Sequence, residues 1–359
     1  MHMADALLSP AVGGTMWVFS AAAIAFCSRK VRSGLDDRKI PLMGVLGAFI
    51  FSAQMVNFTI PVTGSSGHLG GALILSILLG PYAAFLTIAS VLVVQAFFFA
   101  DGGLLALGCN IFNIGFFPAF ITYPLIYKKI IGNSHSAARI SIASLSAAVI
   151  GLQLGALGVV TETVFSEISS LPFYPFVAIM QPIHLAIGVV EGLVTASVIT
   201  FVHTIQPEIL QHAMTRQATG GNPVRILAFC FLTAALLTGG AVSWLASGHP
   251  DGLEWSLQKV TGQTELAAPA GGVHRTLAIL QDKTSVLPDY SFKRPSGISR
   301  GDTPAAAAPV QGKESGRDRL GTTVSGIAGG MLALAVALLV GFALKRRGQP
   351  GGTVAESGR

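Results

Sequence analysis

The segment PYAAFLTIASVLVVQAFFF, residues 81–99, decides the class of this protein, because it runs without a single charged side chain. A helix of about 20 apolar residues crosses the hydrocarbon core of a bilayer. Similar runs recur along the chain, 51% of all residues are hydrophobic and the mean hydropathy is +0.64. Only 11% are charged, against roughly a quarter in a soluble domain. We therefore expect an all-α polytopic membrane protein.

The apolar runs predict how many times the chain crosses the membrane. They fall at about 11–28, 40–58, 70–79, 81–99, 104–127, 138–160, 176–203, 224–246 and 321–344. The run at 70–79 is short, and we expect a partial or tilted span there. Counting it, the pattern indicates about seven spans in a core and a two-span hairpin at the C-terminal end.

Basic residues indicate the orientation of these spans. Short cytoplasmic loops carry an excess of Lys and Arg. The basic residues next to the spans fall on one side of the expected topology: Arg29, Lys30, Arg32, Arg38, Lys39, Lys128, Lys129, Arg139 and the C-terminal LKRRG. The short loops around 59–69, 100–103 and 161–175 contain neither Lys nor Arg. We expect these loops and the N-terminus outside the cytoplasm, and the C-terminus inside it.

The spacing of the spans predicts two parts. Residues 1–215 form a compact block of closely spaced spans, and residues 216–223 form a cytoplasmic linker. Residues 224–359 form a hairpin around a long polar loop, 247–320, which we expect outside the cytoplasm. Residues 294–319 of that loop are rich in Pro, Gly, Ala and Ser, which is typical of a disordered tether.

Composition excludes several other interpretations. The formal net charge of +6 does not indicate nucleic-acid binding, because the charges sit in the loops. The three cysteines, Cys27, Cys109 and Cys230, lie in or beside apolar runs without a CxxC pair, and we interpret them as packing residues. No Lys or Arg precedes the first apolar run, so we expect the N-terminus to be retained rather than cleaved as a signal peptide.

The first two residues, Met1 and His2, present a possible metal chelate. The Met1 amine, the His2 main-chain amide and Nδ1 of its imidazole close a five-membered and a six-membered ring around one ion. Square-planar nitrogen coordination favours Ni(II) or Cu(II) over Zn(II). The alternative interpretation is a histidine without a role at a frayed terminus.

A second histidine could complete this site. His68 lies in TGSSGHLGG, where glycines give the backbone freedom to fold inward. On the expected topology, it lies on the same side as His2 and could occupy the fourth corner of the square. The alternative is a solvated loop histidine.

Polar residues inside apolar runs are functional candidates by default. His184 and Glu191 are seven residues apart, so on a helix they share one face. We expect this class of residue either to orient the imidazoles or to form hydrogen bonds between helices. Its members are Gln54, Asn57, Ser66, Asp101, Asn110, Asn113, His184 and Glu191.

The sequence contains no G-x-x-x-x-G-K-[ST] phosphate loop, no HExxH and no GxGxxG. The motifs of an ATPase, a zinc protease and a dinucleotide-binding domain are therefore missing, and we expect no enzyme and no ATP site in this chain.

Four stretches resemble the CbiM/NikM family, the metal-capturing S component of energy-coupling-factor (ECF) transporters for cobalt and nickel. They are MHMADALLSP, TGSSGHLGG, FFFADGGLLALGCNIFNIGF and PIHLAIGVVEGLVTA, and the resemblance covers about 1–205. It implies a metal site formed by the Met1 amine, the His2 amide and ring, and His68. It also implies separate partner chains: a transmembrane coupling subunit and a pair of cytoplasmic ATPases.

The stretch PDGLEWS, residues 250–256, resembles the small accessory component of the same transporters, the NikN or PDGLE type. This implies an accessory part fused to the S component. Within it, His249, Asp251 and Glu254 either concentrate metal or form a structural turn.

These features together predict uptake of nickel across the plasma membrane, with Ni²⁺ as the transported substrate. Uptake of cobalt (Co²⁺) for cobalamin synthesis by the same mechanism is the alternative within this class. A membrane metal sensor or binding protein is the alternative from another class.

Overall fold

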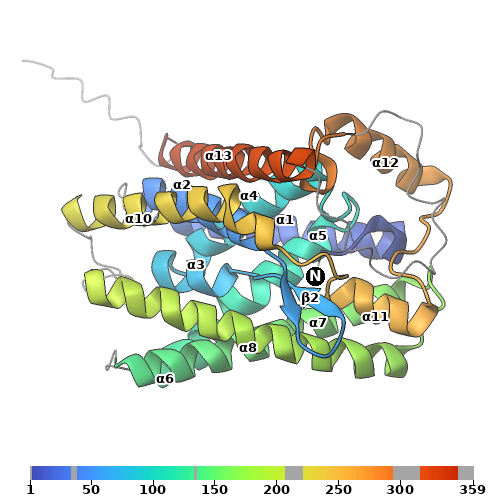
Figure 1. Cartoon of the computed structure of the whole chain (residues 1–359), viewed down its shortest axis with the longest axis horizontal. Coiled ribbons are helices and arrows are strands. Elements are labelled where there is room, and N and C mark those ends of the chain that lie inside the picture. Colours follow the sequence, from blue (N-terminus) through green and yellow to red (C-terminus); the bar gives the residue numbers. More distant parts are fainter. Residues whose placement is uncertain (1, 34–38, 133–135, 207–220, 294–315, 347–359) are drawn as a thin grey trace, which may run out of the picture.

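The computed structural model describes residues 2–33, 39–132, 136–206, 221–293 and 316–346. In these ranges the chain is almost entirely helical, and the long helices lie roughly side by side (Figure 1). This confirms the expected helical class. Three predictions lie wholly or largely outside the described residues. They concern the metal ligand Met1, the linker at 216–223 and the tether at 294–319.

Six helices in the described ranges are long and apolar enough to cross a membrane. Two shorter apolar helices accompany them, at Lys39–Gln54 and Val224–Gly240. Large apolar side chains point outward from the bundle, including Phe19, Phe26 and Phe229. Such a surface suits lipid rather than water.

The first helix shows how local sequence sets an element. Helix α1 (Pro10–Arg32) begins where Ser9 Oγ accepts a hydrogen bond from the main-chain N–H of Val12, with proline at the first helical position. Helices α2 (Lys39–Gln54) and α4 (Pro81–Phe99) follow, and both are deeply buried. Helices α7 (Ala137–Ser166) and α8 (Phe173–Ile205) pack against each other as a long pair.

The short apolar run at 70–79 is helix α3 (Ala72–Leu79), in which every residue is buried. At 1.5 Å per residue, eight helical residues cover about 12 Å, less than half of the apolar thickness of a bilayer. A small antiparallel hairpin, β1 (Phe58–Ile60) and β2 (Ser65–Gly67), precedes it and pairs Phe58 with Gly67. A glycine-containing turn, residues 68–71, therefore connects the hairpin to the start of α3.

The run at 104–127 forms one continuous helical segment with an unusual middle. It consists of α5 (Leu107–Ile111), the wide helix η2 (Phe112–Tyr127) and α6 (Lys128–Ile131). Pro118 and Pro124 lie inside η2. Proline has no N–H to donate, so the regular α-helical ladder cannot continue through these positions.

Helix α7 extends to Ser166, so part of the loop expected at 161–175 is helical. Glu162 lies on this extension and is 8% exposed. Asn113 Nδ2 donates a hydrogen bond of 2.7 Å to its carboxylate. A satisfied acidic side chain can stay buried in a helix, which an apolar-run pattern does not detect.

The C-terminal part packs on the core through its two long helices, α10 (Gly221–Gly240) and α13 (Gly316–Arg346). Both lie against α2. They also meet each other where a Cβ added to Gly326 would lie 2.2 Å from the carbonyl oxygen of Gly239. Small residues let helix backbones approach closely inside a membrane.

The segment 247–320, expected as a polar loop, is folded where the structure describes it. It contains α11 (Gly252–Thr261), α12 (Gly272–Thr284) and the short 3₁₀ helix η4 (Pro288–Tyr290). Another 3₁₀ helix, η3 (Val242–Leu245), comes just before this segment. Asp251 caps α11: its carboxylate accepts from Leu253 and Glu254 N–H, and Glu254 accepts from Asp251 N–H. The two acidic residues of PDGLE thus form a capping box, which corresponds to the structural turn expected as one of the two roles of this motif.

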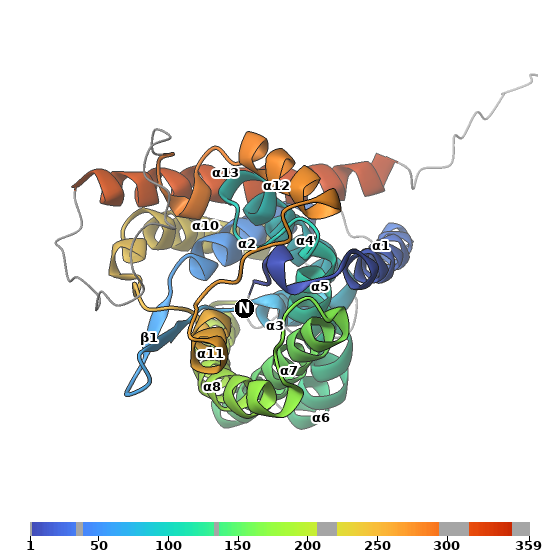
Figure 2. The same ribbon diagram turned by 90° about the vertical axis from the view of Figure 1, so that its right-hand side faces the viewer.

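The N-terminus, the β-hairpin, α11 and α12 gather at one end of the bundle (Figure 1). Viewed onto that end, the N-terminus lies near the centre, between α11 and α5 (Figure 1 and Figure 2). The site therefore has to be sought at this end.

Candidate metal site at the N-terminal end

The chain around Met3 is anchored on both sides of its main chain. Met3 N–H donates to Asn110 Oδ1 at 2.8 Å, and Asn110 Nδ2 donates back to Met3 carbonyl at 3.2 Å. Gly103 N–H also donates to that carbonyl, at 2.9 Å. The Met3 side chain is 0% exposed and packs with Leu7 and Leu8. His2 is thus attached to a fixed segment rather than a frayed end.

The ring of His2 faces a carboxylate. Its Nδ1 lies 3.0 Å from Asp101 Oδ1, and Tyr290 donates its hydroxyl hydrogen to the other oxygen, Oδ2. Burial alone would raise the pKa of Asp101, but the His2 charge and the hydrogen bonds from His2 and Tyr290 hold it below its usual range. A carboxylate only accepts, so Nδ1 carries the hydrogen. His2 Nε2 is buried without a hydrogen-bond partner.

His68 lies directly against His2. The two ring centroids are 4.9 Å apart and the rings are within 5° of parallel. Nδ1 of His68 lies 3.1 Å from the carbonyl of Leu69, so it donates and Nε2 is the nitrogen with the lone pair. Burial lowers the pKa of His68 to about 3, so the imidazole is neutral at physiological pH.

Two buried side chains hold the turn after His68. Glu191 accepts from Gly70 and Gly71 N–H, at 3.0 Å each. Gln54 donates to Gly70 carbonyl at 2.8 Å and accepts from Gln95 at 2.9 Å. Gly71 has a φ of +76°, a left-handed conformation that favours glycine. The glycines after His68 therefore serve a defined turn that is attached to α8.

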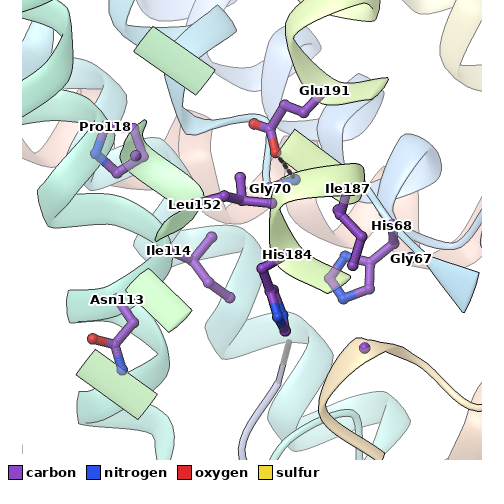
Figure 3. Close-up of a pocket in the computed structure, with 12 residues that line it drawn as sticks. Gly67, His68, Gly70, Asn113, Ile114, Pro118, Leu152, His184, Ile187 and Glu191 are labelled. Atoms are coloured by element: carbon purple, nitrogen blue, oxygen red, sulfur yellow. Dashed lines mark hydrogen bonds between the residues drawn. The ribbon is translucent and has the colours of Figure 1, made fainter. Parts of the chain in front are cut away.

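A cavity lies beside His68 (Figure 3). The rings of His68 and His184 border it from two elements, the turn after β2 and helix α8. Glu191 and Gly70 lie at its border, joined by the hydrogen bond that the figure marks. His184 Nδ1 lies 2.8 Å from Met180 carbonyl, and His184 is 1% exposed.

The C-terminal part closes over the site. Ser66 N–H and hydroxyl donate to the carbonyls of Pro250 and His249, both at 2.8 Å. Asn57 carbonyl accepts from Ser247 N–H at 2.7 Å. Ser66 and Asn57, expected near the imidazoles, thus contact the C-terminal part through these bonds.

The acidic residues of PDGLE differ in protonation. Burial would raise the pKa of Asp251, but nearby positive charge and the hydrogen bond from the Glu254 N–H hold it below its usual range. Burial and the neighbouring Asp251 charge raise the pKa of Glu254 to about 7. Asp251 is therefore a partly buried anion at the same end of the bundle as His2 and His68.

The structure brings His2, His68 and Asp101 together, and it places Glu191 behind the His68 turn and His184 at the cavity. Sequence reasoning missed Tyr290, because a tyrosine in a polar loop carries no signal of a partner nearly 200 positions away. In the part of the chain that the structure describes, no three His, Cys, Asp or Glu side chains are grouped so that they could hold a metal ion by themselves.

The core and the C-terminal part each match a known family model. Residues 2–209 match the CbiM model, described as "Cobalt uptake substrate-specific transmembrane region", and residues 225–346 match the PDGLE domain. The resemblance to the CbiM/NikM family and the fused PDGLE-type domain are thereby confirmed.

Relatives and a solved structure agree with this assignment. The chain is 31% identical to the "Fused nickel transport protein NikMN" of Rhodobacter capsulatus, over 81% of this chain and 88% of the relative. It is 27% identical to the "Cobalt transport protein CbiM" of Geobacter sulfurreducens, over 67% and 72%. A crystal structure of a truncated transition metal transporter, 30% identical, aligns with a TM-score of 0.50 over 57% of this chain and 99% of that one.

The fold, the histidine pair and the two matched models lead to one conclusion. This chain belongs to the CbiM family of metal transport components, with a PDGLE domain joined to it, and not to a class of catalytic enzymes.

Proposed function

We propose that this chain is the substrate-specific component of an ATP-driven ECF-type transporter that takes up nickel ions. It binds the ion at the N-terminal end of the bundle, outside the cytoplasm, and delivers it inward. The observation that carries this proposal is the parallel contact of His2 and His68, which are distant in sequence and converge at the end where the N-terminus lies.

The donor set is the Met1 amine, the His2 amide and imidazole, and His68 Nε2. Main-chain nitrogens complete this set, since no three His, Cys, Asp or Glu side chains are grouped around one point among the residues that the structure describes. The hydrogen bond from His68 Nδ1 to Leu69 carbonyl supports its role, since such a bond orients a metal-binding imidazole and sets its tautomer.

Chelation through His2 Nδ1 has a structural consequence. That nitrogen carries a hydrogen and faces Asp101. The imidazole has to change tautomer, with its hydrogen on Nε2 instead of Nδ1, and the contact with Asp101 has to open before Nδ1 can bind a metal ion. Asp101 then remains beside the site as a partly buried anion, which offsets the positive charge of a divalent ion.

Basic residues support the orientation. Arg29, Lys30 and Arg32 end α1, and Lys128 and Lys129 lie in α6. These ends lie away from the N-terminus, the hairpin and α11 (Figure 1). Under the positive-inside rule the site therefore faces away from the cytoplasm. In this arrangement, the metal-binding core comprises residues 1–215. A cytoplasmic linker, 216–223, joins it to the accessory part, 224–359.

The energy for transport comes from separate chains, a transmembrane coupling subunit and cytoplasmic ATPases. The sequence has no phosphate loop of its own. Nickel is preferred because a planar set of four nitrogens suits Ni(II), and because the fused relative is named for nickel. Cobalt uptake by the same mechanism is the second candidate, favoured by the relative named for cobalt.

Equilibrium titration of the full-length protein with Ni(II) and Co(II), with an untagged native N-terminus, tests the site. We expect tight nickel binding with the visible band of a square-planar complex, and its loss in His2→Ala and in His68→Ala. His203→Ala, near the end of the same α8 but remote from the site, is the matched control. Wild-type affinity in either site variant would refute the chelate.

A second variant tests the terminal amine. One residue inserted between Met1 and His2 enlarges a chelate ring and should abolish tight binding. Uptake by cells that do or do not carry genes for the coupling subunit and the ATPases distinguishes a transporter from a metal sensor, because a sensor binds the metal without partner-dependent uptake.

A further inference from the structure

His184 is a buried histidine whose second nitrogen has nothing to bind. It lies on α8 and is 1% exposed. Its Nδ1 donates to Met180 carbonyl at 2.8 Å, so Nε2 carries the lone pair. Nε2 is buried and has no hydrogen-bond partner among the residues that the structure describes. A buried acceptor without a partner lowers the stability of a folded protein, so such an atom in a native structure often has a functional role.

That nitrogen borders the cavity next to His68. Figure 3 shows the two imidazoles at one cavity, with Ile187 of α8 beside His68 and Glu191 further along the same helix. Gly252 of the C-terminal part closes the cavity: a Cβ there would lie 3.1 Å from His184 Cε1 and 3.3 Å from Nε2. Ile187, one turn further along α8, lies against Gly67, and Glu191 holds the turn after His68. His184 therefore lies on the side of His68 toward α11, at the N-terminal end of the bundle.

The same face of α8 continues with polar groups. Glu191, seven residues on, is about 10 Å further along the helix axis and is 1% exposed. Thr195, one turn beyond, has a buried hydroxyl without a hydrogen-bond partner. The buried face of α8 thereby leads from the site toward the other end of the bundle, where α8 ends at Ile205.

We propose that His184 Nε2 is a second, weaker binding position for the transported divalent metal ion, which it occupies before it reaches the His2/His68 site. This proposal rests on the proposed function. One imidazole nitrogen and water would hold Ni²⁺ or Co²⁺ there. Weak binding suits the position, because an ion in transit has to be able to leave.

Equilibrium binding of Co(II) to the full-length protein with a native N-terminus tests this position. Bound metal and the visible Co(II) spectrum are followed to high free-metal concentration. We expect the wild type to bind a tight first equivalent and a weak second one. His184→Asn, which keeps a group near Nδ1 for Met180 carbonyl but removes Nε2, should lose only the second.

The matched control is Ile187→Ala. It enlarges the same cavity without removing a nitrogen and should keep both equivalents. Retention of the first equivalent in His184→Asn also reports that this variant is folded.

Three outcomes overturn the proposal. They are a single equivalent in the wild type, both equivalents in His184→Asn, and loss of the first equivalent in that variant, which would place His184 in the primary site. Failure of the proposed function looks different: the wild type would then lack the tight first equivalent.

Discussion

The hydroxyl of Tyr290, in the C-terminal part, donates a hydrogen bond to Asp101, in the loop after α4. The other oxygen of that carboxylate lies 3.0 Å from His2 Nδ1. The PDGLE domain is therefore connected to the N-terminal histidine by two polar contacts in series. Tyr290 also stacks on Phe99 with ring centroids 5.1 Å apart, which keeps its ring in place.

Tyr290→Phe removes this hydrogen bond and keeps the ring. The ionised form of Asp101 loses a donor, so we expect nickel affinity to fall about 10-fold, at the low end for residues that orient metal ligands. Titration with Ni(II) measures it. Tyr174→Phe, on an exposed tyrosine, makes the same chemical change away from the site and should bind as the wild type does. Equal affinity in both variants contradicts the connection.

Asp101→Asn keeps the shape of the side chain and removes its charge. Without this partly buried anion beside the site, a divalent ion is held less well, and we expect affinity to fall by about 10- to 100-fold. Asp282→Asn is the control, because Asp282 pairs with Lys293 on the surface of α12. If Asp101→Asn binds nickel as tightly as the control, the carboxylate has no electrostatic role.

The stability of the protein should fall in acid because of His68. Burial lowers its folded-state pKa to about 3 from 6.5. Between those values the unfolded chain takes up a proton that the folded chain excludes. Stability is therefore highest above pH 6.5 and declines as the pH drops toward 3, by up to about 1.4 kcal/mol per pH unit.

Thermal unfolding of the purified protein at pH 7 and pH 5 measures this effect. His68→Gln cannot take up the proton, so its Tm should change less between the two pH values than that of the wild type. His249→Gln is the control for losing a histidine at the same end of the bundle. A pH response in His68→Gln as large as in the wild type argues against a buried neutral imidazole.

Gly326→Ala should separate α13 from α10. The added Cβ would lie 2.2 Å from Gly239 carbonyl oxygen, and the opposing atom is main chain, which cannot turn away. We expect destabilisation of about 1–3 kcal/mol, seen as a lower Tm. Gly240→Ala, where a Cβ meets nothing within 4 Å, should be tolerated. An unchanged Tm in Gly326→Ala would show that this helix contact adapts.

Much of the fold could be predicted from sequence, because a membrane span is a local property of about 20 neighbouring residues. The expected runs at 11–28 and 176–203 correspond closely to α1 and α8. Hydropathy could not show whether the run at 70–79 crosses the membrane, since the length of its eight-residue helix depends on the turn before it. The helices within 247–293 were not predicted, because short amphipathic helices in a polar segment lack a long apolar run.

Hydropathy and motif spacing are enough to identify a helical membrane protein of the CbiM type, and they single out His2, His68, Asp101, His184 and Glu191. Both are local properties of the chain. The folded structure is needed to show that the rings of His2 and His68 stack, that Tyr290 reaches Asp101, and that His184 Nε2, beside a cavity, has no partner among the described residues. These are contacts between segments distant in the chain, and they arise when the helices, the hairpin and the PDGLE domain pack at one end of the bundle.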